Sequence, residues 1–327
     1  SGKEKVEGEG RLWEEGEEDK GEAGRKLGVE VLKAVQGMAG LGEETRKIWV
    51  TRGGVEVREG EGLEVELGVV WGMVAAVMKE ETEKRNRLVD VGRGERVGES
   101  VVSEVREGEE ETEVAWREGV RYGRRMERVA GEKREERGKL LSGAGSVLVS
   151  GGLGGIGREI ARWLARRGVE QVVLVGRRGS KGRGAEREVR ELEEMGVRVK
   201  VEEADVEKRE EVRRVIKGIG KEYPLRGIVH AAGVLEDGVM GEQTEEKVKR
   251  VMGVKVRGGW NLEKESEGEE VELFVMASSV AGTMGSAGQG GYSGGNAFVD
   301  GLARKRKAEG KPGKSVAWGP WAAVGMA

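Results

Sequence analysis

The stretch Ser150-Gly-Gly-Leu-Gly-Gly-Ile-Gly157 decides how this chain folds. The apolar run 147–149 precedes it, and the segment 158–165, with apolar residues at helical spacing, follows it. We therefore expect a strand, a glycine turn and a helix. Small residues let the backbone of such a turn approach a pyrophosphate, and the first N–H groups of the helix supply donors. The stretch predicts a dinucleotide site, with a plain glycine turn as the alternative in a chain of 59 glycines.

Strands and helices alternate along the chain from residue 146 onward. The pattern predicts strands at 146–150, 171–175, 198–202, 227–231, 271–277 and 314–318. Apolar residues at helical spacing predict helices at 157–167, 184–195, 207–218, 244–263 and 292–309. Because strands that alternate with helices form parallel sheets, we expect an α/β fold over residues 144–327, a Rossmann-type parallel sheet with helices on both faces.

Residues 1–143 are predicted to form a separate unit that ends in a linker. Roughly the first 25 residues are rich in Gly, Glu, Lys and Arg and are expected to pack poorly. The charge-dense segment 128–139 is interpreted as a linker or a solvated helix. Between them we expect helices at 28–40 and 69–78, strands at 47–51 and 87–91, and a segment of mixed charge at 92–128.

The composition excludes several classes of function. The net charge is −3, so no general attraction to nucleic acid or to an anionic membrane is expected. The chain has no cysteine and one histidine, which excludes disulfides, thiolate metal sites and multi-histidine metal sites. The sequence has no run of about 18 apolar residues and no charged-then-apolar signal stretch. We therefore expect a cytoplasmic protein that binds no metal, nucleic acid or membrane.

The residues after the second and third predicted strands suit the adenosine half of a dinucleotide. Arg177 and Arg178 follow the second strand, where an acid would bind a ribose 2′-hydroxyl but arginine accommodates a 2′-phosphate. NADPH is therefore favoured over NADH, with an ordinary surface arginine pair as the alternative. Asp205 and Val206 follow the third strand, where the carboxylate can meet an adenine amino group.

The fourth predicted strand ends in His230, Ala231, Ala232 and Gly233, whose small residues allow a nicotinamide ribose to pass closely. His230 is the sole histidine, a residue type that often serves as a general base. Its place inside the end of a strand favours a packed, hydrogen-bonded role instead.

The residues around the fifth predicted strand can carry chemistry. Ser278 and Ser279 end this strand, and Tyr292 and Asn296 share one face of the next helix because they are four residues apart. A tyrosine phenol, with a reference pKa of about 10, needs a nearby cation to exchange protons at pH 7. Lys255, on the preceding helix, can provide it. A serine hydroxyl can then hold a carbonyl while the phenol protonates the oxygen that becomes an alcohol as hydride arrives.

At these residues the chain resembles the ketoreductase domains of modular polyketide synthases, a branch of the short-chain dehydrogenase/reductases. Ordinary members of that superfamily carry Tyr-x-x-x-Lys, whereas this chain has Tyr292-Ser-Gly-Gly-Asn296 with Lys255 upstream, as synthase ketoreductases do. The upstream half resembles the structural subdomain of the same family, a Rossmann relative without cofactor. Further matches lie at 229–235, 287–292 and 317–321, and in the upstream half at 48–53, 70–73 and 88–90.

The resemblance implies a role for each of these residues. Tyr292 would be the acid, Ser279 the donor to the carbonyl, Lys255 the cation that tunes Tyr292 and binds ribose hydroxyls, and Asn296 the residue that completes the relay. The implied NADPH contacts come from the glycine turn, the following strand ends and Lys255: Ser150, Gly151, Gly152, Leu153, Gly154, Gly155, Ile156, Gly157, Arg177, Arg178, Asp205, Val206, His230, Ala231, Ala232 and Gly233.

The resemblance also bears on the substrate side of the site. B-type members of the family carry Leu-Asp-Asp, and this chain has Leu235-Glu236-Asp237, where a solvated acidic turn is the alternative. A-type members have a tryptophan where this chain has Met284, and Gln289 lies near the same loop. A B-type, D-configured hydroxyl product is therefore expected.

The implied activity is NADPH-dependent reduction of a β-ketoacyl thioester to a β-hydroxyacyl thioester. The acyl chain would arrive on the phosphopantetheine arm of an acyl carrier protein, beside other domains of a megasynthase. The alternatives are a fatty acid synthase ketoreductase and a catalytically silent cofactor-binding scaffold. Family members continue beyond Ala327 into a lid helix and a last strand, so we expect this chain to be an internal part of a longer ketoreductase region.

Overall fold

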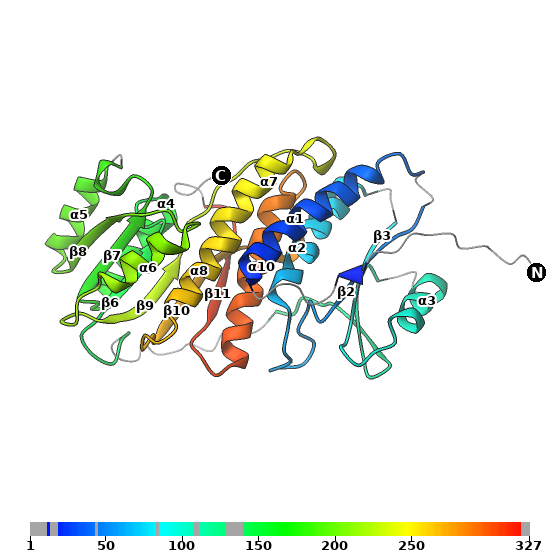
Figure 1. Cartoon of the computed structure of the whole chain (residues 1–327), viewed down its shortest axis with the longest axis horizontal. Coiled ribbons are helices and arrows are strands. Elements are labelled where there is room, and N and C mark those ends of the chain that lie inside the picture. The colour runs from blue at the N-terminus through cyan, green and yellow to red at the C-terminus, as the bar shows by residue number, and fades with distance from the viewer. Residues whose placement is uncertain are drawn as a thin grey trace, which may run out of the picture.

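The chain folds into two sheets with a layer of helices between them (Figure 1). The computed structural model describes the backbone of residues 12–13 and 107 and, with side chains, residues 19–42, 45–82, 85–106, 111–128, 140–182 and 184–321. Buried apolar side chains of both halves meet in one continuous core, in which Leu67 and Met73 lie together with Met252 and Phe298. The N-terminal half therefore supports the helices that cover the C-terminal sheet.

The N-terminal sheet has the strand order β1-β2-β3-β4-β5. Its strands run parallel except for β5, which is antiparallel to β4. The elements of this half are β1 (Leu12–Trp13), α1 (Lys20–Gly37), β2 (Lys47–Arg52), η1 (Val65–Leu67), α2 (Gly68–Glu80), β3 (Asn86–Val91), α3 (Val97–Glu107), β4 (Glu113–Arg117) and β5 (Val120–Gly123).

The C-terminal sheet is parallel throughout, with the order β11-β10-β9-β6-β7-β8. Read from the other edge this is the doubly wound order 3-2-1-4-5-6, in which ligands bind where the order reverses, between β6 and β9. The strands are β6 (Ser146–Ser150), β7 (Gln171–Gly176), β8 (Arg198–Glu203), β9 (Leu225–His230), β10 (Leu273–Ser279) and β11 (Lys314–Trp318).

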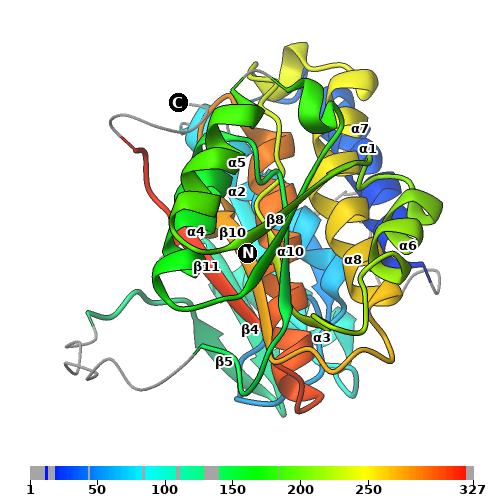
Figure 2. The same cartoon turned by 90° about the vertical axis from the view of Figure 1, so that its left-hand side faces the viewer.

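Helices cover both faces of the C-terminal sheet (Figure 2). α4 and α5 lie on one face, and α6, α8 and α10 lie on the other, where α1 and α2 pack against them. The helices of this half are α4 (Gly155–Arg166), α5 (Ala185–Glu194), α6 (Arg209–Lys217), α7 (Glu245–Met252), α8 (Gly258–Glu265), α9 (Val280–Met284) and α10 (Gly290–Ala308). Three short turns complete it: η2 (Gly179–Lys181), η3 (Met240–Glu242) and the π-helical turn η4 (Gly253–Arg257).

The structure confirms the predicted α/β fold and each strand and helix predicted between residues 146 and 318, with ends that differ by a few residues. One difference is qualitative. The helix predicted at 244–263 is divided by η4, in which the hydrogen bonds span five residues and the helix widens. The glycines at 253, 258 and 259 accompany this interruption, because they weaken the regular helix at both ends of the turn.

The N-terminal half departs further from prediction. Helix α1 begins at Lys20 rather than at Gly28, because the Asp19 side chain accepts the Glu22 N–H and caps it. Residues 20–25 are therefore well packed, contrary to expectation, while residues 1–11 and 14–18 lie outside the described part. The segment 92–128 holds α3, β4 and β5, which its mixed charge concealed. Residues 129–139 of the predicted linker are likewise not described.

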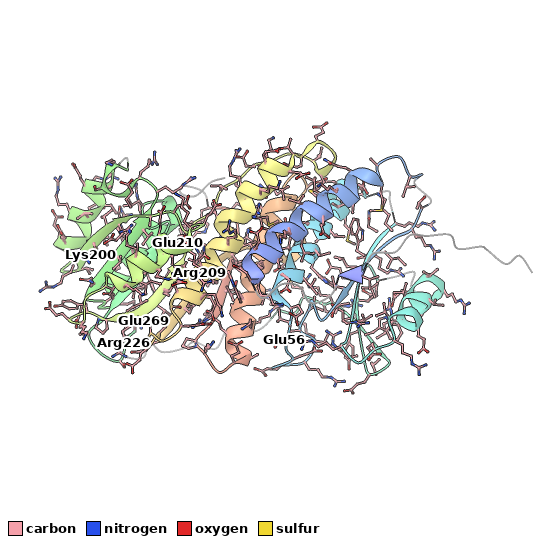
Figure 3. The ribbon with its side chains drawn as sticks, viewed as in Figure 1. Glu56, Lys200, Arg209, Glu210, Arg226 and Glu269 are labelled. Carbon is pink, nitrogen blue, oxygen red and sulfur yellow. The ribbon has the colours of Figure 1, made fainter. Side chains whose placement is uncertain are left out.

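Charged side chains project from the surface of both halves (Figure 3). Many of them form ion pairs with one another, as Arg226 does with Glu270 and Glu272, and Arg209 with Glu265. Exposed pairs of this kind contribute little to stability, so the core carries the fold. None of the helices in the described ranges combines the length and apolarity that membrane crossing requires.

The contact between α2 and α10 is close enough to predict the effect of one methyl group. A Cβ added at Gly72 would overlap the Ser293 carbonyl and lie 2.6 Å from its carbon. We expect Gly72→Ala to lower the free energy of unfolding by about 1–3 kcal/mol through overpacking. Gly37→Ala, where a Cβ meets open space in α1, should instead leave stability unchanged or raise it by up to about 1 kcal/mol. Urea denaturation of both variants measures this; equal stabilities would contradict it.

Candidate functional site

The glycine turn after β6 folds back on itself and on the end of β9. Gly151 has a φ of 68°, and a Cβ there would lie 2.7 Å from the Ala232 nitrogen. A Cβ at Gly157 would overlap the Gly151 carbonyl oxygen, and Gly154 donates its N–H to that oxygen at 2.8 Å. These close approaches require glycine. They bring the N-terminus of α4, with its free N–H groups, to the carboxyl edge of the sheet.

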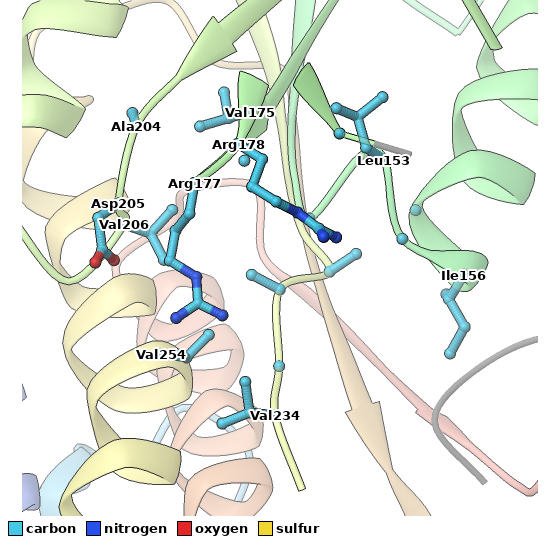
Figure 4. A pocket seen from close by; sticks show the side chains of 18 of the residues that line it. Leu153, Ile156, Val175, Arg177, Arg178, Ala204, Asp205, Val206, Val234 and Val254 are labelled. Carbon is cyan, nitrogen blue, oxygen red and sulfur yellow. The ribbon is translucent and has the colours of Figure 1, made fainter. Parts of the chain in front are cut away.

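A pocket of about 770 Å³ lies at this edge (Figure 4). It is formed by the glycine turn and by the segments that follow β7, β8 and β9. The side chains of Arg177 and Arg178 extend into it, and Val254 closes the side toward η4. The predicted cofactor residues in its lining are Gly151, Leu153, Gly154, Gly155, Ile156, Gly157, Arg177, Arg178, Asp205, Val206, Ala231, Ala232 and Gly233.

Four residues predicted to contact the cofactor are absent from the pocket lining, namely Lys255, described below, and Ser150, Gly152 and His230, which lie behind the pocket wall. Ser150 and His230 are paired residues of β6 and β9, and a 2.7 Å hydrogen bond joins Ser150 Oγ to His230 Nδ1. Both side chains are fully buried. Burial and the positive charge of Lys255 lower the pKa of His230 to about 3, so the imidazole is neutral at pH 7. Gly152 packs on Leu174. All three therefore support the wall of the pocket.

Lys255 lies on the π-helical turn η4, next to the pocket residue Val254. Its side chain is buried, and Nζ donates to the Ala277 carbonyl at 2.5 Å. A Cβ at Gly295 would lie 3.0 Å from the Lys255 Cβ, which places the lysine stem against α10 at Gly295. Burial lowers the pKa of Lys255 to about 8, and the negative charge of Asp300 opposes this shift. The group is still largely an ammonium at pH 7.

The other predicted catalytic residues lie on α10 and at the end of β10. Asn296 is buried, donates from Nδ2 to the Tyr292 carbonyl at 2.8 Å, and has no partner for Oδ1 among the described residues. Ser279 ends β10 and caps α9, where Oγ accepts the Ala281 N–H at 3.2 Å. Tyr292 is half-buried in the first turn of α10. Packing thus joins Lys255 to α10, and all four residues lie outside the lining of the pocket.

The predicted substrate residues lie on two loops that touch each other. Gly238 donates its N–H to the Gly288 carbonyl at 2.8 Å. The residues next to these two glycines also meet, because Gln289 Nε2 lies 3.3 Å from an oxygen of Asp237. The Glu236 carboxylate pairs with Arg250 instead, while Met284 is exposed at the end of α9 and Leu235 is half-buried.

Asp300 is a site neighbour that sequence reasoning missed. It follows Asn296 by one turn, so Tyr292, Asn296 and Asp300 form one stripe along α10. Its carboxylate accepts from the Ser315 hydroxyl, and burial raises its pKa above the usual range. The signal was present in the sequence, because the spacing of four residues that singled out Asn296 also reaches position 300.

Both halves of the chain match profiles of known protein domains. Residues 145–323 match the profile described as KR domain, and residues 6–126 match that of the Rossmann fold domain of polyketide synthase extender module SpnB. Polyketide synthase GfsA of Streptomyces halstedii is 36% identical over 90% of this chain. That match covers 4% of GfsA, so the chain spans a small part of this curated relative.

Two solved structures are also similar to this chain. The first, titled as A-type ketoreductases from a modular polyketide synthase, superposes with a TM-score of 0.86 at 31% identity, covering 91% of this chain and 64% of that chain. The second is PlmKR1, the ketoreductase from the first module of phoslactomycin biosynthesis in Streptomyces sp. HK803. It has a TM-score of 0.83 at 31% identity and covers 97% of this chain and 72% of that chain.

Proposed function

Because this chain belongs to the KR domain family of polyketide synthases, whose members are oxidoreductases with a nicotinamide cofactor, we propose that it reduces a β-ketoacyl thioester with NADPH. The acyl chain is proposed to arrive on the phosphopantetheine arm of an acyl carrier protein, and the product is a β-hydroxyacyl thioester. One observation carries the proposal: a pocket with a glycine cradle and two arginines adjoins the turn that bears a buried lysine.

The residues of the pocket fit a 2′-phosphorylated dinucleotide. The glycine turn leaves no room for a Cβ at 151 or 157, so the backbone can approach a pyrophosphate closely. Arg177 and Arg178 supply positive charge where the adenosine ribose would lie. When bound, NADPH would supply the hydride that adds to the ketone carbon, which is the β-carbon of the acyl thioester.

Side chains of the protein donate the proton and bind the carbonyl oxygen of the substrate in the proposed reaction. We assign Tyr292 as the acid that gives its phenolic proton to the carbonyl oxygen, and Ser279 Oγ as a donor that holds this oxygen. The Lys255 ammonium stabilises the phenolate left behind, because an adjacent positive charge favours the ionised form. Asn296 Oδ1 has no donor within the described part of the chain, which supports a role for Asn296 in the relay, since a buried acceptor without a donor is costly unless a water or ligand satisfies it.

We further propose B-type stereochemistry, with a D-configured hydroxyl. The support is the Leu235-Glu236-Asp237 turn, which lies against the loop of Gln289, together with Met284 in the place of a tryptophan. One similar structure is titled A-type, so the product configuration is the deciding observation.

The test is turnover of a diketide N-acetylcysteamine thioester, followed by the loss of NADPH absorbance and by chiral chromatography of the product. We expect NADPH oxidation and a D-configured β-hydroxy thioester. Cofactor binding without turnover would instead favour a silent cofactor-binding scaffold. An L-configured product would refute the B-type assignment while leaving the reductase assignment intact.

Cofactor preference gives a second test. We expect the double substitution of Arg177 and Arg178 by alanine to weaken NADPH binding at least about tenfold and to leave NADH binding nearly unchanged. The physical reason is that only NADPH carries the 2′-phosphate, and a charge-assisted hydrogen bond contributes about 1.5–3 kcal/mol. Fluorescence titration measures both affinities. Arg187→Ala, on the exposed surface of α5, is the matched control. Equal losses for both cofactors would contradict the prediction.

A further inference from the structure

The two substrate loops are held from the N-terminal half of the chain. Glu80 is the last residue of α2, and its two carboxylate oxygens accept backbone N–H groups from different loops. One oxygen accepts from Met240 at 2.8 Å, and the other accepts from Gly288 at 2.9 Å. A single side chain of the N-terminal half therefore joins the loop of Asp237 to the loop of Gln289.

Other residues of α1 and α2 also contact the Asp237 and Gln289 loops. Gln36 of α1 donates from Nε2 to the Gln243 carbonyl at 2.9 Å, which holds the far end of the Asp237 loop. Gly285, at the start of the Gln289 loop, packs so closely on α2 that a Cβ there would overlap the Ala75 carbonyl. Helices α1 and α2 thus form the surface on which both loops are built.

The position of Glu80 is unfavourable for the helix that carries it. The C-terminal end of a helix carries partial negative charge, so an acidic residue in the last turn destabilises α2 slightly. Its two hydrogen bonds to N–H groups are charge-assisted and offset this cost. An acidic residue at a helix C-terminus is thus retained here where its carboxylate makes contacts with distant parts of the chain.

We propose that Glu80 is a positioning residue for the substrate, setting the arrangement of the Asp237 and Gln289 loops that determines which face of the ketone receives hydride. The proposal rests on the proposed reductase function. Gly288 is the link: it donates to Glu80 and accepts from Gly238, so a shift of Glu80 moves the residues on both sides of the Asp237–Gln289 contact. Gln289 also precedes the first turn of α10, and its carbonyl accepts the Ser293 N–H.

The test compares Glu80→Gln with Glu80→Asp. The amide of Glu80→Gln keeps one acceptor but directs an NH2 group at a backbone N–H, so one loop loses its partner. We expect KM for the thioester to rise about tenfold and the single product configuration to become a mixture, while kcat changes little. NADPH affinity should stay unchanged, because the part of the Asp237 loop that lines the cofactor pocket ends at Val234, before Met240, and the Gln289 loop is not in the lining. Glu80→Asp keeps both acceptor oxygens and should restore most of the product selectivity.

Two further measurements distinguish a failure of the Glu80 proposal from a failure of the proposed reductase function. Glu242→Gln removes an exposed carboxylate from the same loop and should behave as the wild type. Hydrogen exchange at the Met240 and Gly288 amides, measured without substrate, should accelerate in Glu80→Gln. Accelerated exchange with unchanged KM and product ratio would overturn the proposal, as would unchanged exchange. Absence of turnover in the wild type would overturn the proposed function instead, and the exchange measurement would still decide whether Glu80 holds the loops.

Discussion

Replacement of Tyr292 by phenylalanine should reduce thioester turnover by about 10²–10⁴-fold while NADPH binding is retained. The substitution removes only the phenolic oxygen, and among the described residues no hydrogen bond to this oxygen holds the fold. The ring stays half-buried in the first turn of α10 and is not part of the pocket lining, so the cofactor pocket should keep its shape. The acid of the proposed reaction is lost, and the Lys255 ammonium remains without a phenolate to stabilise.

The measurement pairs initial rates of NADPH oxidation with a fluorescence titration of NADPH. Tyr223→Phe is the matched control, because that ring packs under Arg198 at the base of the C-terminal sheet. It should retain full activity. Wild-type turnover in Tyr292→Phe would remove Tyr292 from the mechanism, and a parallel loss of NADPH affinity would show a structural role instead.

The second large effect concerns the glycine cradle. We expect Gly157→Ala to weaken NADPH binding by about a hundredfold or more. The new Cβ would overlap the Gly151 carbonyl oxygen and lie 2.8 Å from the Gly152 Cα, so the turn must move away from the helix. A misplacement of about 1 Å costs on the order of a hundredfold in catalytic rate, and we expect a loss of NADPH affinity of the same order here. Because the turn supplies the N–H donors for the pyrophosphate, the loss should appear in affinity for both NADPH and NADH.

Gly154→Ala is the matched comparison, because its new Cβ would also approach the Gly151 carbonyl oxygen but less closely. A Cβ at Gly154 would lie 3.1 Å from the Gly151 carbonyl, a distance that a shift of a few tenths of an ångström relieves. We expect a much smaller loss of affinity, measured by the same titration and checked by thermal unfolding. Equal effects of the two substitutions would show that the methyl groups act in the pocket and not through the turn.

The fold of the C-terminal half was predictable because its signals are local. Most strands contain an apolar run such as 147–149 or 172–175, and β8 alternates valines with charged residues. Each helix repeats apolar residues every three to four positions, so a short window contains the evidence. The N-terminal half was less predictable. The helix at Lys20 depends on one capping side chain at Asp19. The charges of α3, β4 and β5 leave no clear apolar pattern, because the buried residues of α3 are the polar Ser100 and Glu104 and β5 is largely exposed.

Part of the candidate site could likewise be predicted from the sequence, and part could not. The residues that line the cofactor pocket follow strand ends, and the ends of parallel strands meet at one edge. Sequence spacing could not reveal that Ser150 and His230 turn away from this pocket toward each other. Their hydrogen bond depends on the register of β6 and β9, which pairs two residues that lie 80 positions apart.

The sequence by itself determined the alternation of strands and helices, the glycine turn and the spacing of Tyr292 and Asn296, because each depends on residues within a few positions of one another. Tertiary structure alone decided which side chains hold the substrate loops. Glu80 meets Met240 and Gly288 across 160 and 208 positions, and such contacts leave no periodicity in the sequence. They exist only because α2 packs against α10 and brings the end of one helix to the loop before the other.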